Sequence, residues 1–129
     1  IPTSTGAAKL IGVIFPELKN KVDGIAIRVP TPDVSFIDFV CEVEKETTKE
    51  EVNKAFEQAS MGSMGKYLQY LTEPLVSCDL IGNSHSSIFD AALTAVIEKT
   101  LVKTYGWYDN EWGYASRIVD LIKYISQWL

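Results

Sequence analysis

Two segments of the sequence carry side chains that could hold an anion. Residues 3–6 read Thr-Ser-Thr-Gly and stand directly before an apolar stripe of helical spacing. Gly6 would let a ligand approach backbone N–H groups at a helix start, where the helix dipole favours negative charge. Arg28 is a lone guanidinium in an apolar stretch and could make paired hydrogen bonds to phosphate oxygens. Phosphate binding is the chemistry indicated; the alternatives are that Thr5 or Ser4 only caps the helix and that Arg28 is a solvated or salt-bridged strand residue.

A second candidate site lies in residues 107–114, which read Trp-Tyr-Asp-Asn-Glu-Trp-Gly-Tyr. Aromatic side chains of this segment could form the wall of a site for a planar ligand. The side-chain amide of Asn110 can both donate and accept a hydrogen bond, as recognition of a carboxamide requires. The alternative is that Asn110 caps the last helix and that the aromatic residues belong to the core.

A nucleophile with an adjacent base is missing from the pattern. His85 is the one histidine and lies in a polar stretch, while Cys41 and Cys78 have no activating group nearby in the sequence. One histidine and two distant cysteines give no zinc-ligand spacing. Neither a G-x-G-x-x-G segment nor a P-loop is present. We therefore expect no catalytic residue, no metal site and no dinucleotide fingerprint in this chain.

Length and composition exclude several classes of protein. The chain has 129 residues, 47% of them apolar and 22% charged, which fits one globular domain but is short for an enzyme with separate cofactor and substrate domains. No apolar run approaches the ~20 residues of a membrane span, and the net charge of -5 disfavours non-specific binding to nucleic acid or anionic lipid. The cysteines are expected to be reduced and buried, as in a cytoplasmic protein. The start at Ile1 shows no signal peptide and indicates a piece of a longer chain.

The elements that must position these residues follow from the hydrophobic periodicity. Thr48 and Glu51 form a capping-box pattern that would open a helix. Residues 86–97 are ambiguous, because their alanines favour helix while their length suits either state. The other expected helices lie at 7–14, 48–62 and from 111 onward. The last of them has the apolar stripe Ile118, Leu121, Ile122, Ile125 and Leu129. Strands are expected at 25–29, 34–43 and 101–108, with interrupted strand pieces within 67–76.

Several blocks follow one another in a particular order along residues 1–125. They are Ile-Pro-Thr-Ser-Thr-Gly-Ala-Ala-Lys at 1–9, Ile-Arg-Val-Pro-Thr-Pro at 27–32, Pro-Leu-Val-Ser at 74–77, His-Ser-Ser at 85–87 with Phe-Asp at 89–90, and the aromatic segment at 107–114. In this order they resemble the C-terminal part of the catalytic domain of the phosphorylating glyceraldehyde-3-phosphate dehydrogenase family. One block would be a weak signal, whereas several in order are specific.

The resemblance implies roles for five residues. Thr5 and Gly6 fall where the family holds the attacking inorganic phosphate or the substrate phosphate, and Arg28 falls on its phosphate-binding arginine. Asn110 falls on the asparagine that binds the nicotinamide carboxamide of NAD, and Tyr114 falls where an aromatic residue packs near that ring. These five residues are the site that we expect.

The resemblance also implies a fold. It is α+β, a mixed, mostly antiparallel sheet with helices packed on one face, the other face being used between subunits of a homotetramer. Residues 86–97 are similar to a strand that forms a hairpin with residues 101–108, which overrules the alanine propensity. The family's catalytic cysteine, general-base histidine and NAD-binding Rossmann domain match positions upstream of Ile1. Residues 1–129 are therefore expected to be a single partial domain that is inactive alone.

The expected parent is the glycolytic NAD-dependent enzyme that oxidises and phosphorylates D-glyceraldehyde 3-phosphate to 1,3-bisphosphoglycerate. Its ligands would be this small-molecule substrate, inorganic phosphate and NAD, and its compartment the cytoplasm. Two alternatives stay open: a part of an erythrose-4-phosphate dehydrogenase, which is a close relative, and a non-catalytic oligomerisation module. The choice between NAD and NADP depends on the domain that the sequence does not contain.

Overall fold

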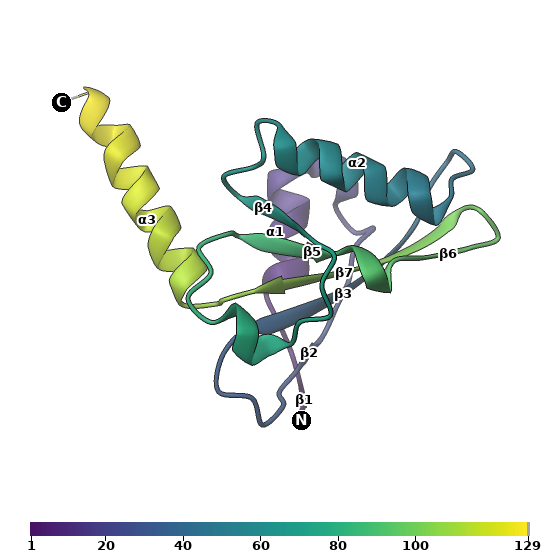
Figure 1. The fold of residues 1–129 in the computed structure, drawn as a ribbon, viewed down its shortest axis with the longest axis horizontal. Coiled ribbons are helices and arrows are strands. Elements are labelled where there is room, and N and C mark those ends of the chain that lie inside the picture. The colour runs from purple at the N-terminus through teal and green to yellow at the C-terminus, as the bar shows by residue number, and fades with distance from the viewer. Residues whose placement is uncertain (129) are drawn as a thin grey trace. The chain divides into compact units, whose positions relative to one another are not determined.

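The structure is a computed structural model that describes residues 1–128 (Figure 1). The chain divides into two compact units, Ile1–Thr31 and Pro32–Leu129, and each is described by itself. Within the described residues, no helix is long and apolar enough to cross a membrane.

Ile1–Thr31 contains a short ribbon and a helix. β1 (Pro2–Thr3) pairs antiparallel with β2 (Ala26–Ile27), and α1 (Ala7–Ile14) with the 3₁₀ helix Pro16–Leu18 lies between them in the chain. The helix predicted at 7–14 is confirmed. It ends before Pro16 because a proline disfavours helical backbone at the residue that precedes it. The strand predicted at 25–29 is shorter, since its partner β1 soon gives way to α1.

Pro32–Leu129 contains a five-stranded sheet. Its strands are β3 (Ser35–Glu42), β4 (Leu68–Leu71), β5 (Ser87–Asp90), β6 (Ala95–Ile97) and β7 (Leu101–Tyr108). The order across the sheet is β3-β7-β5-β4, and β6 also pairs with β7. β4 and β5 run parallel and the other pairs are antiparallel. The expected α+β fold with a mixed, mostly antiparallel sheet is confirmed.

The ambiguous segment is extended. β5 and β6 both pair with β7, and the alanines form only a 3₁₀ turn, Ala91–Leu93, between the two strands. Ile88 (0% exposed) joins a core cluster on one face of the sheet, whereas Phe89 (3% exposed) joins a second cluster on the other face. Consecutive residues reach opposite faces in a strand but not in a helix. The alanine propensity is therefore wrong here, and the strand implied by the resemblance is confirmed.

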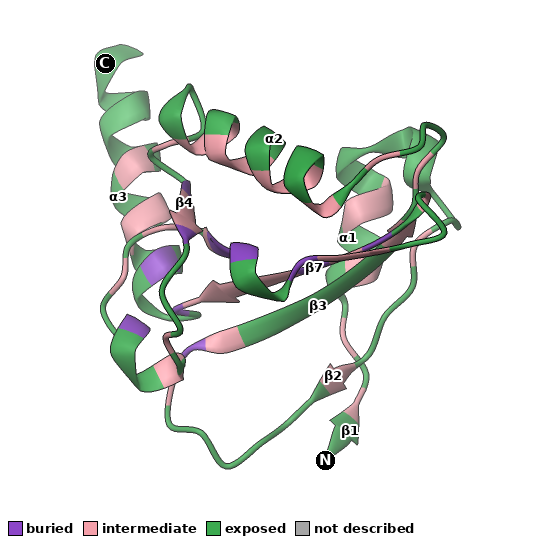
Figure 2. Cartoon of the chain, turned by 45° about the vertical axis from the view of Figure 1, so that its right-hand side comes forward, coloured by how far each residue is buried: buried purple, intermediate pink, exposed green. Residues whose placement is uncertain are grey.

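α2 (Lys49–Met61) covers one face of the sheet (Figure 2). The ring of Phe56 stacks on Phe89 with 3.9 Å between centroids, and the same cluster includes Val52 from the helix. The predicted capping box is confirmed: the Glu51 N–H donates to Thr48 Oγ1 at 3.2 Å, and the Thr48 N–H donates to the Glu51 carboxylate at 3.0 Å. The helix start is thus fixed by the sequence around Thr48.

α3 (Trp112–Ile125) projects from the end of β7 (Figure 1). The predicted helix is confirmed, but its apolar stripe is exposed rather than packed: Ile118, Leu121, Ile122 and Ile125 are between 39% and 61% exposed. Leu129, the last expected member of the stripe, lies outside the described residues. The helix is therefore held mainly through contacts near its start.

The outermost strand of the sheet, β3, is apolar on both faces. Phe36 and Val40 lie on one face, Ile37 and Phe39 on the other, and all four are between 42% and 50% exposed. Only the middle and the β4 side of the sheet are well covered within this unit.

Neither cysteine forms a disulfide. Cys41 is half-buried on β3, whereas Cys78 is exposed, so the expected burial is wrong for Cys78. Cys78 lies in the 3₁₀ helix Ser77–Leu80, where Leu80 occupies the position that enters the core.

Thr48→Ala should lower the free energy of unfolding by about 1 kcal/mol, because it removes the side-chain acceptor at the helix start. Thr48→Ser retains the hydroxyl and serves as the matched control. Urea denaturation of the two variants measures the difference. Equal stability of the Ala and Ser variants would contradict the capping role.

Candidate functional site

Three of the expected site residues lie in Ile1–Thr31. Thr5 and Gly6 follow β1 after Ser4, and Arg28 directly follows β2. The ribbon register places Arg28 opposite Ile1: the Ile1 amine donates to the Arg28 carbonyl at 2.7 Å, and the Arg28 N–H donates to the Ile1 carbonyl at 2.9 Å. Among the described residues, Arg28 has no hydrogen bond to Thr5 or Gly6. The ribbon brings these residues into one unit without joining them.

The start of α1 is open. Gly6 is the N-cap residue, with φ -83° and ψ -8°, and no side chain caps it. Thr5 Oγ1 accepts a hydrogen bond from the Ala7 N–H at 3.2 Å, so the capping alternative is realised in part, by Thr5 and not by Ser4. A Cβ built on Gly6 would meet no atom within 4 Å. The space in front of this glycine is therefore free for a ligand.

Arg28 is an exposed cation. None of the ion pairs among residues 1–128 includes it, so the salt-bridged alternative is not observed. Its guanidinium is available to an anion, and an anion would not have to displace a carboxylate to reach it.

The other two expected residues line one hollow in Pro32–Leu129. The hollow has a volume of ≈ 310 Å³ and lies where β7 gives way to α3. Asn110 directly precedes the N-cap residue of α3, Tyr114 lies in the first turn of this helix, and both residues line the hollow. The lining consists of Ser86, Tyr108, Asp109, Asn110, Gly113, Tyr114 and Arg117.

Asp109 fixes this junction. Its carboxylate is 2% exposed and accepts N–H bonds from Gly82 at 2.8 Å, from Glu111 at 3.0 Å and from Trp112 at 2.7 Å. Burial acts to raise the pKa of the Asp109 carboxyl, but the three N–H bonds, together with a hydrogen bond with the Asp33 side chain, outweigh it and the pKa is lowered. The capping alternative for Asn110 is not observed: the N-cap residue of α3 is Glu111, and the side chain that accepts from the amides at the helix start is that of Asp109.

Asn110 is held from β3. The Ser35 hydroxyl donates to Asn110 Oδ1 at 3.1 Å, across 75 positions of the sequence. This bond leaves the Asn110 side-chain N–H groups for another acceptor. Tyr114 is 69% exposed, so one face of its ring is open to a ligand.

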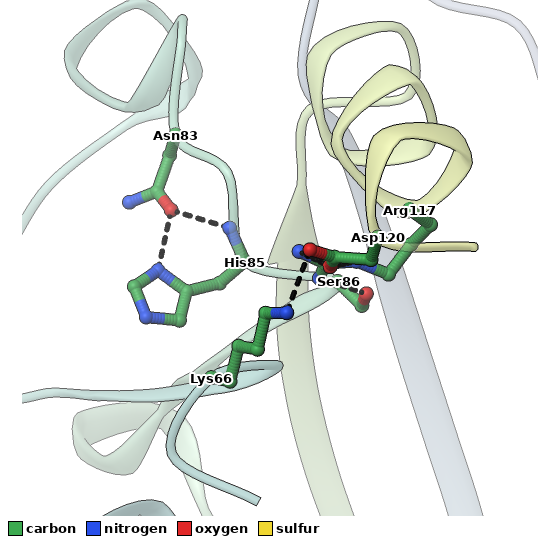
Figure 3. A network of polar contacts seen from close by, with 6 residues as sticks. All are labelled: Lys66, Asn83, His85, Ser86, Arg117 and Asp120. Atoms are coloured by element: carbon green, nitrogen blue, oxygen red, sulfur yellow. Dashed lines mark hydrogen bonds and ion pairs between the residues drawn. The ribbon is translucent and has the colours of Figure 1, made fainter. Parts of the chain in front are cut away.

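Figure 3 shows a polar network that includes Ser86 and Arg117, two residues of the lining of the hollow. Arg117 Nε and one terminal nitrogen each lie 2.9 Å from the Asp120 carboxylate, and the other terminal nitrogen donates to Ser86 Oγ at 2.9 Å. Lys66 Nζ lies 2.6 Å from the other Asp120 oxygen. The hydrogen bond from Lys66 lowers the pKa of Asp120 most, and the positive charges of Lys66 and Arg117 lower it further. Sequence reasoning missed Arg117 and Ser86, although Arg117 stands three residues after Tyr114 and so shares its helix face.

His85 is engaged within its own loop. Its Nδ1 lies 2.8 Å from Asn83 Oδ1, and its backbone N–H donates to the same oxygen at 3.0 Å (Figure 3). Asn83 in turn donates to Gln69 Oε1 at 2.7 Å. These bonds give His85 a structural place in the loop between the 3₁₀ helix Ser77–Leu80 and β5.

Comparisons with known proteins agree on one family. The family model described as glyceraldehyde 3-phosphate dehydrogenase, C-terminal domain, matches residues 1–110. The chain is 51% identical over 129 residues to glyceraldehyde-3-phosphate dehydrogenase 2 of Streptomyces avermitilis, covering 100% of the chain and 38% of that relative. It is 53% identical over 127 residues to glyceraldehyde-3-phosphate dehydrogenase 1 of Bacillus subtilis and 53% identical over 126 residues to the Geobacillus stearothermophilus enzyme, covering 98% of the chain in each case. The chain spans 38% of the length of these curated relatives.

Asp109→Asn should lower the free energy of unfolding at neutral pH by about 1–3 kcal/mol, because the amide offers one acceptor oxygen to three N–H donors of part-buried hydrogen bonds. The folded-state pKa lies below the unfolded value, so this stabilisation is complete above the unfolded Asp pKa of about 3.9 and is lost as the pH falls through the folded-state pKa. The difference between parent and variant should therefore shrink in acid. Urea unfolding between neutral pH and about pH 3, with exposed Glu73→Gln as control, measures it; a difference independent of pH would contradict the assignment.

Proposed function

Since the chain belongs to the glyceraldehyde 3-phosphate dehydrogenase family and matches its C-terminal domain, we propose that it is the phosphate-binding and nicotinamide-orienting part of an NAD-dependent phosphorylating dehydrogenase. The proposed reaction of the whole protein is oxidation and phosphorylation of D-glyceraldehyde 3-phosphate to 1,3-bisphosphoglycerate, a step of glycolysis in the cytoplasm. The observation that carries this proposal is the hollow at the start of α3, which joins the amide of Asn110 and the ring of Tyr114.

Thr5, Gly6 and Arg28 are proposed to hold the attacking inorganic phosphate or the phosphate of the substrate. The Thr5 hydroxyl can donate to a phosphate oxygen while it accepts from the Ala7 N–H. The open backbone at Gly6 lies at the start of α1, where the helix dipole favours an anion. Arg28 would add a charge-assisted, paired contact. The free guanidinium and the open glycine support this assignment.

The residues of the hollow fit a nicotinamide group. NAD, when bound, supplies the acceptor for the hydride. Asn110 would bind the carboxamide through its side-chain N–H groups, which Ser35 does not use, and through the second lone pair of Oδ1. Tyr114 would pack near the ring with its open face. These two contacts would fix the orientation of the ring, on which a transfer between two bound partners depends.

The proposed reaction also needs a thiolate that adds to the aldehyde and a histidine that takes its proton. We place both, together with the NAD-binding Rossmann domain, in parts of the parent protein outside residues 1–129. We infer that Cys41, Cys78 and His85 stand at non-catalytic positions of the family; both thiols are free and His85 is already bonded to Asn83. Residues 1–129 are thus proposed to be one part of the catalytic domain, able to hold ligands and unable to turn over substrate alone.

One observation supports the proposed assembly into a homotetramer. The strand β3 exposes Phe36, Ile37, Phe39 and Val40, and apolar surface of this extent is typical of a subunit interface. A role as an oligomerisation module alone would use the same strand but would leave the ligand residues without a purpose. Erythrose-4-phosphate dehydrogenase is the alternative within the enzyme class, and the relative turnover of the two aldehydes distinguishes them.

Arg28→Leu in the full-length protein should raise the KM for inorganic phosphate or the aldehyde phosphate by roughly 10- to 150-fold, the equivalent of one charge-assisted contact. Thr5→Ala removes a neutral hydroxyl and should have a smaller effect, roughly 2- to 10-fold. Lys21→Leu removes an exposed charge from the same unit and serves as the control. Steady-state kinetics at varied phosphate measure the three values, and equal effects at Arg28 and Thr5 would contradict the ranking.

Asn110→Ala should raise the KM for NAD about tenfold and leave the KM for phosphate unchanged, because it removes the proposed carboxamide contact. Glu111→Gln alters the exposed neighbour that does not line the hollow and serves as the control. Initial rates at varied NAD test the assignment. An unchanged KM for NAD and unchanged kcat in the Asn110 variant would overturn the nicotinamide role.

A further inference from the structure

We propose that Arg117 is a positioning residue for the nicotinamide site: it fixes the first turns of α3, and with them the position of Tyr114 relative to Asn110, against the segment that leads into β5. The proposal rests on the proposed function for the nicotinamide contact and adds a residue that neither the sequence pattern nor the resemblance assigns. It concerns the geometry of the hollow and not a direct contact with the ligand.

α3 needs such an anchor because its apolar stripe is exposed. Near its start, Asp109 caps the first amides, and Gly113 packs so closely on the preceding loop that a Cβ there would lie 3.2 Å from the His85 carbonyl oxygen. These two contacts act at the first turn. They hold the start of the helix in place but leave its direction to be set by contacts further along.

Arg117 supplies the contacts of the second turn. Its guanidinium joins Asp120 on the same helix to Ser86, directly before β5, with 2.9 Å for each hydrogen bond. The Arg117 Cζ also lies 4.8 Å from the centroid of the Tyr67 ring, in the chain that leads from α2 to β4. The planar guanidinium, through its hydrogen bonds and its contact with the Tyr67 ring, thus links α3 to two other segments of the unit.

The same side chain lines the hollow beside Asn110 and Tyr114. Tyr114 precedes Arg117 by three residues, so both lie on one helix face. A tilt of α3 that followed the loss of Arg117 would displace Tyr114 relative to the Asn110 amide, which the bond from Ser35 and the Asp109 contacts hold in place. Displacements of about 1 Å are enough to impair a site that works by orientation.

Loss of Arg117 should spare the fold. Asp120 would keep its ion pair with Lys66 at 2.6 Å, so no carboxylate is left unpaired when the guanidinium is removed. The hydrogen bond that disappears without a substitute is the one to Ser86. The variant therefore tests the link between α3 and β5 more than the stability of the chain.

The experiment uses the full-length protein with Arg117→Gln, Ser86→Ala and, as the matched control on the same helix, Lys123→Gln. Arg117→Gln should raise the KM for NAD roughly tenfold and leave the KM for phosphate unchanged. Ser86→Ala, which removes only the hydroxyl acceptor, should raise the KM for NAD by about threefold. Lys123→Gln should change neither constant.

A double variant shows whether Arg117 acts through Asn110. Asn110→Ala with Arg117→Gln should raise the KM for NAD little beyond Asn110→Ala alone, because the amide relative to which Tyr114 is positioned is already absent. Additive effects, or a lower kcat with both KM values unchanged in the Arg117 and Ser86 variants, would overturn the positioning role. If Asn110→Ala itself leaves NAD kinetics unchanged, the proposed function of the hollow fails, and this outcome is distinct from failure of the Arg117 proposal alone.

Discussion

The buried carboxylate of Asp109 is the constraint on which the end of the sheet and the start of α3 depend. A carboxylate that is 2% exposed is stable only where hydrogen bonds replace its water, and three backbone N–H groups do so here. Two of them belong to the beginning of α3 and one to Gly82, whose φ of 82° suits glycine. The Asp109 carboxylate therefore joins the end of the sheet, the loop at Gly82 and the start of the helix, and this arrangement places the adjacent Asn110.

The fold illustrates which structural features a sequence encodes locally. α1, α2 and the long strands β3 and β7 follow from periodicity, because each has a pattern that its own residues complete. The segment with β5 does not, since Ile88 and Phe89 are buried by β4, β7 and α2, which are distant in sequence. The preference of alanine for a helix is local, and its free energy is smaller than the free energy that this packing supplies. The resemblance, which carries tertiary information, was needed for that segment.

The candidate site also contains some residues that a local pattern predicts and others that it does not. Spacing and residue type single out Gly6, Arg28 and Asn110, and the resemblance adds their roles. The hydrogen bonds that hold the hollow come from Ser35 and Ser86, which lie 75 and 31 positions from their partners. No local pattern distinguishes such serines from solvated ones. The adjacent Asp109 and Asn110 are both good helix caps, and only burial decides between them.

The exposed edge of β3 affects how the chain associates with other chains in solution. In its unit this strand is paired along one side only, so its other edge offers a row of backbone donors and acceptors. It extends over Ser35–Glu42 and is apolar on both faces. Such an edge is a template for backbone pairing with a second polypeptide, which makes self-association dependent on concentration. An exposed, apolar edge of this kind favours aggregation of partly folded chains as well as pairing with a second polypeptide.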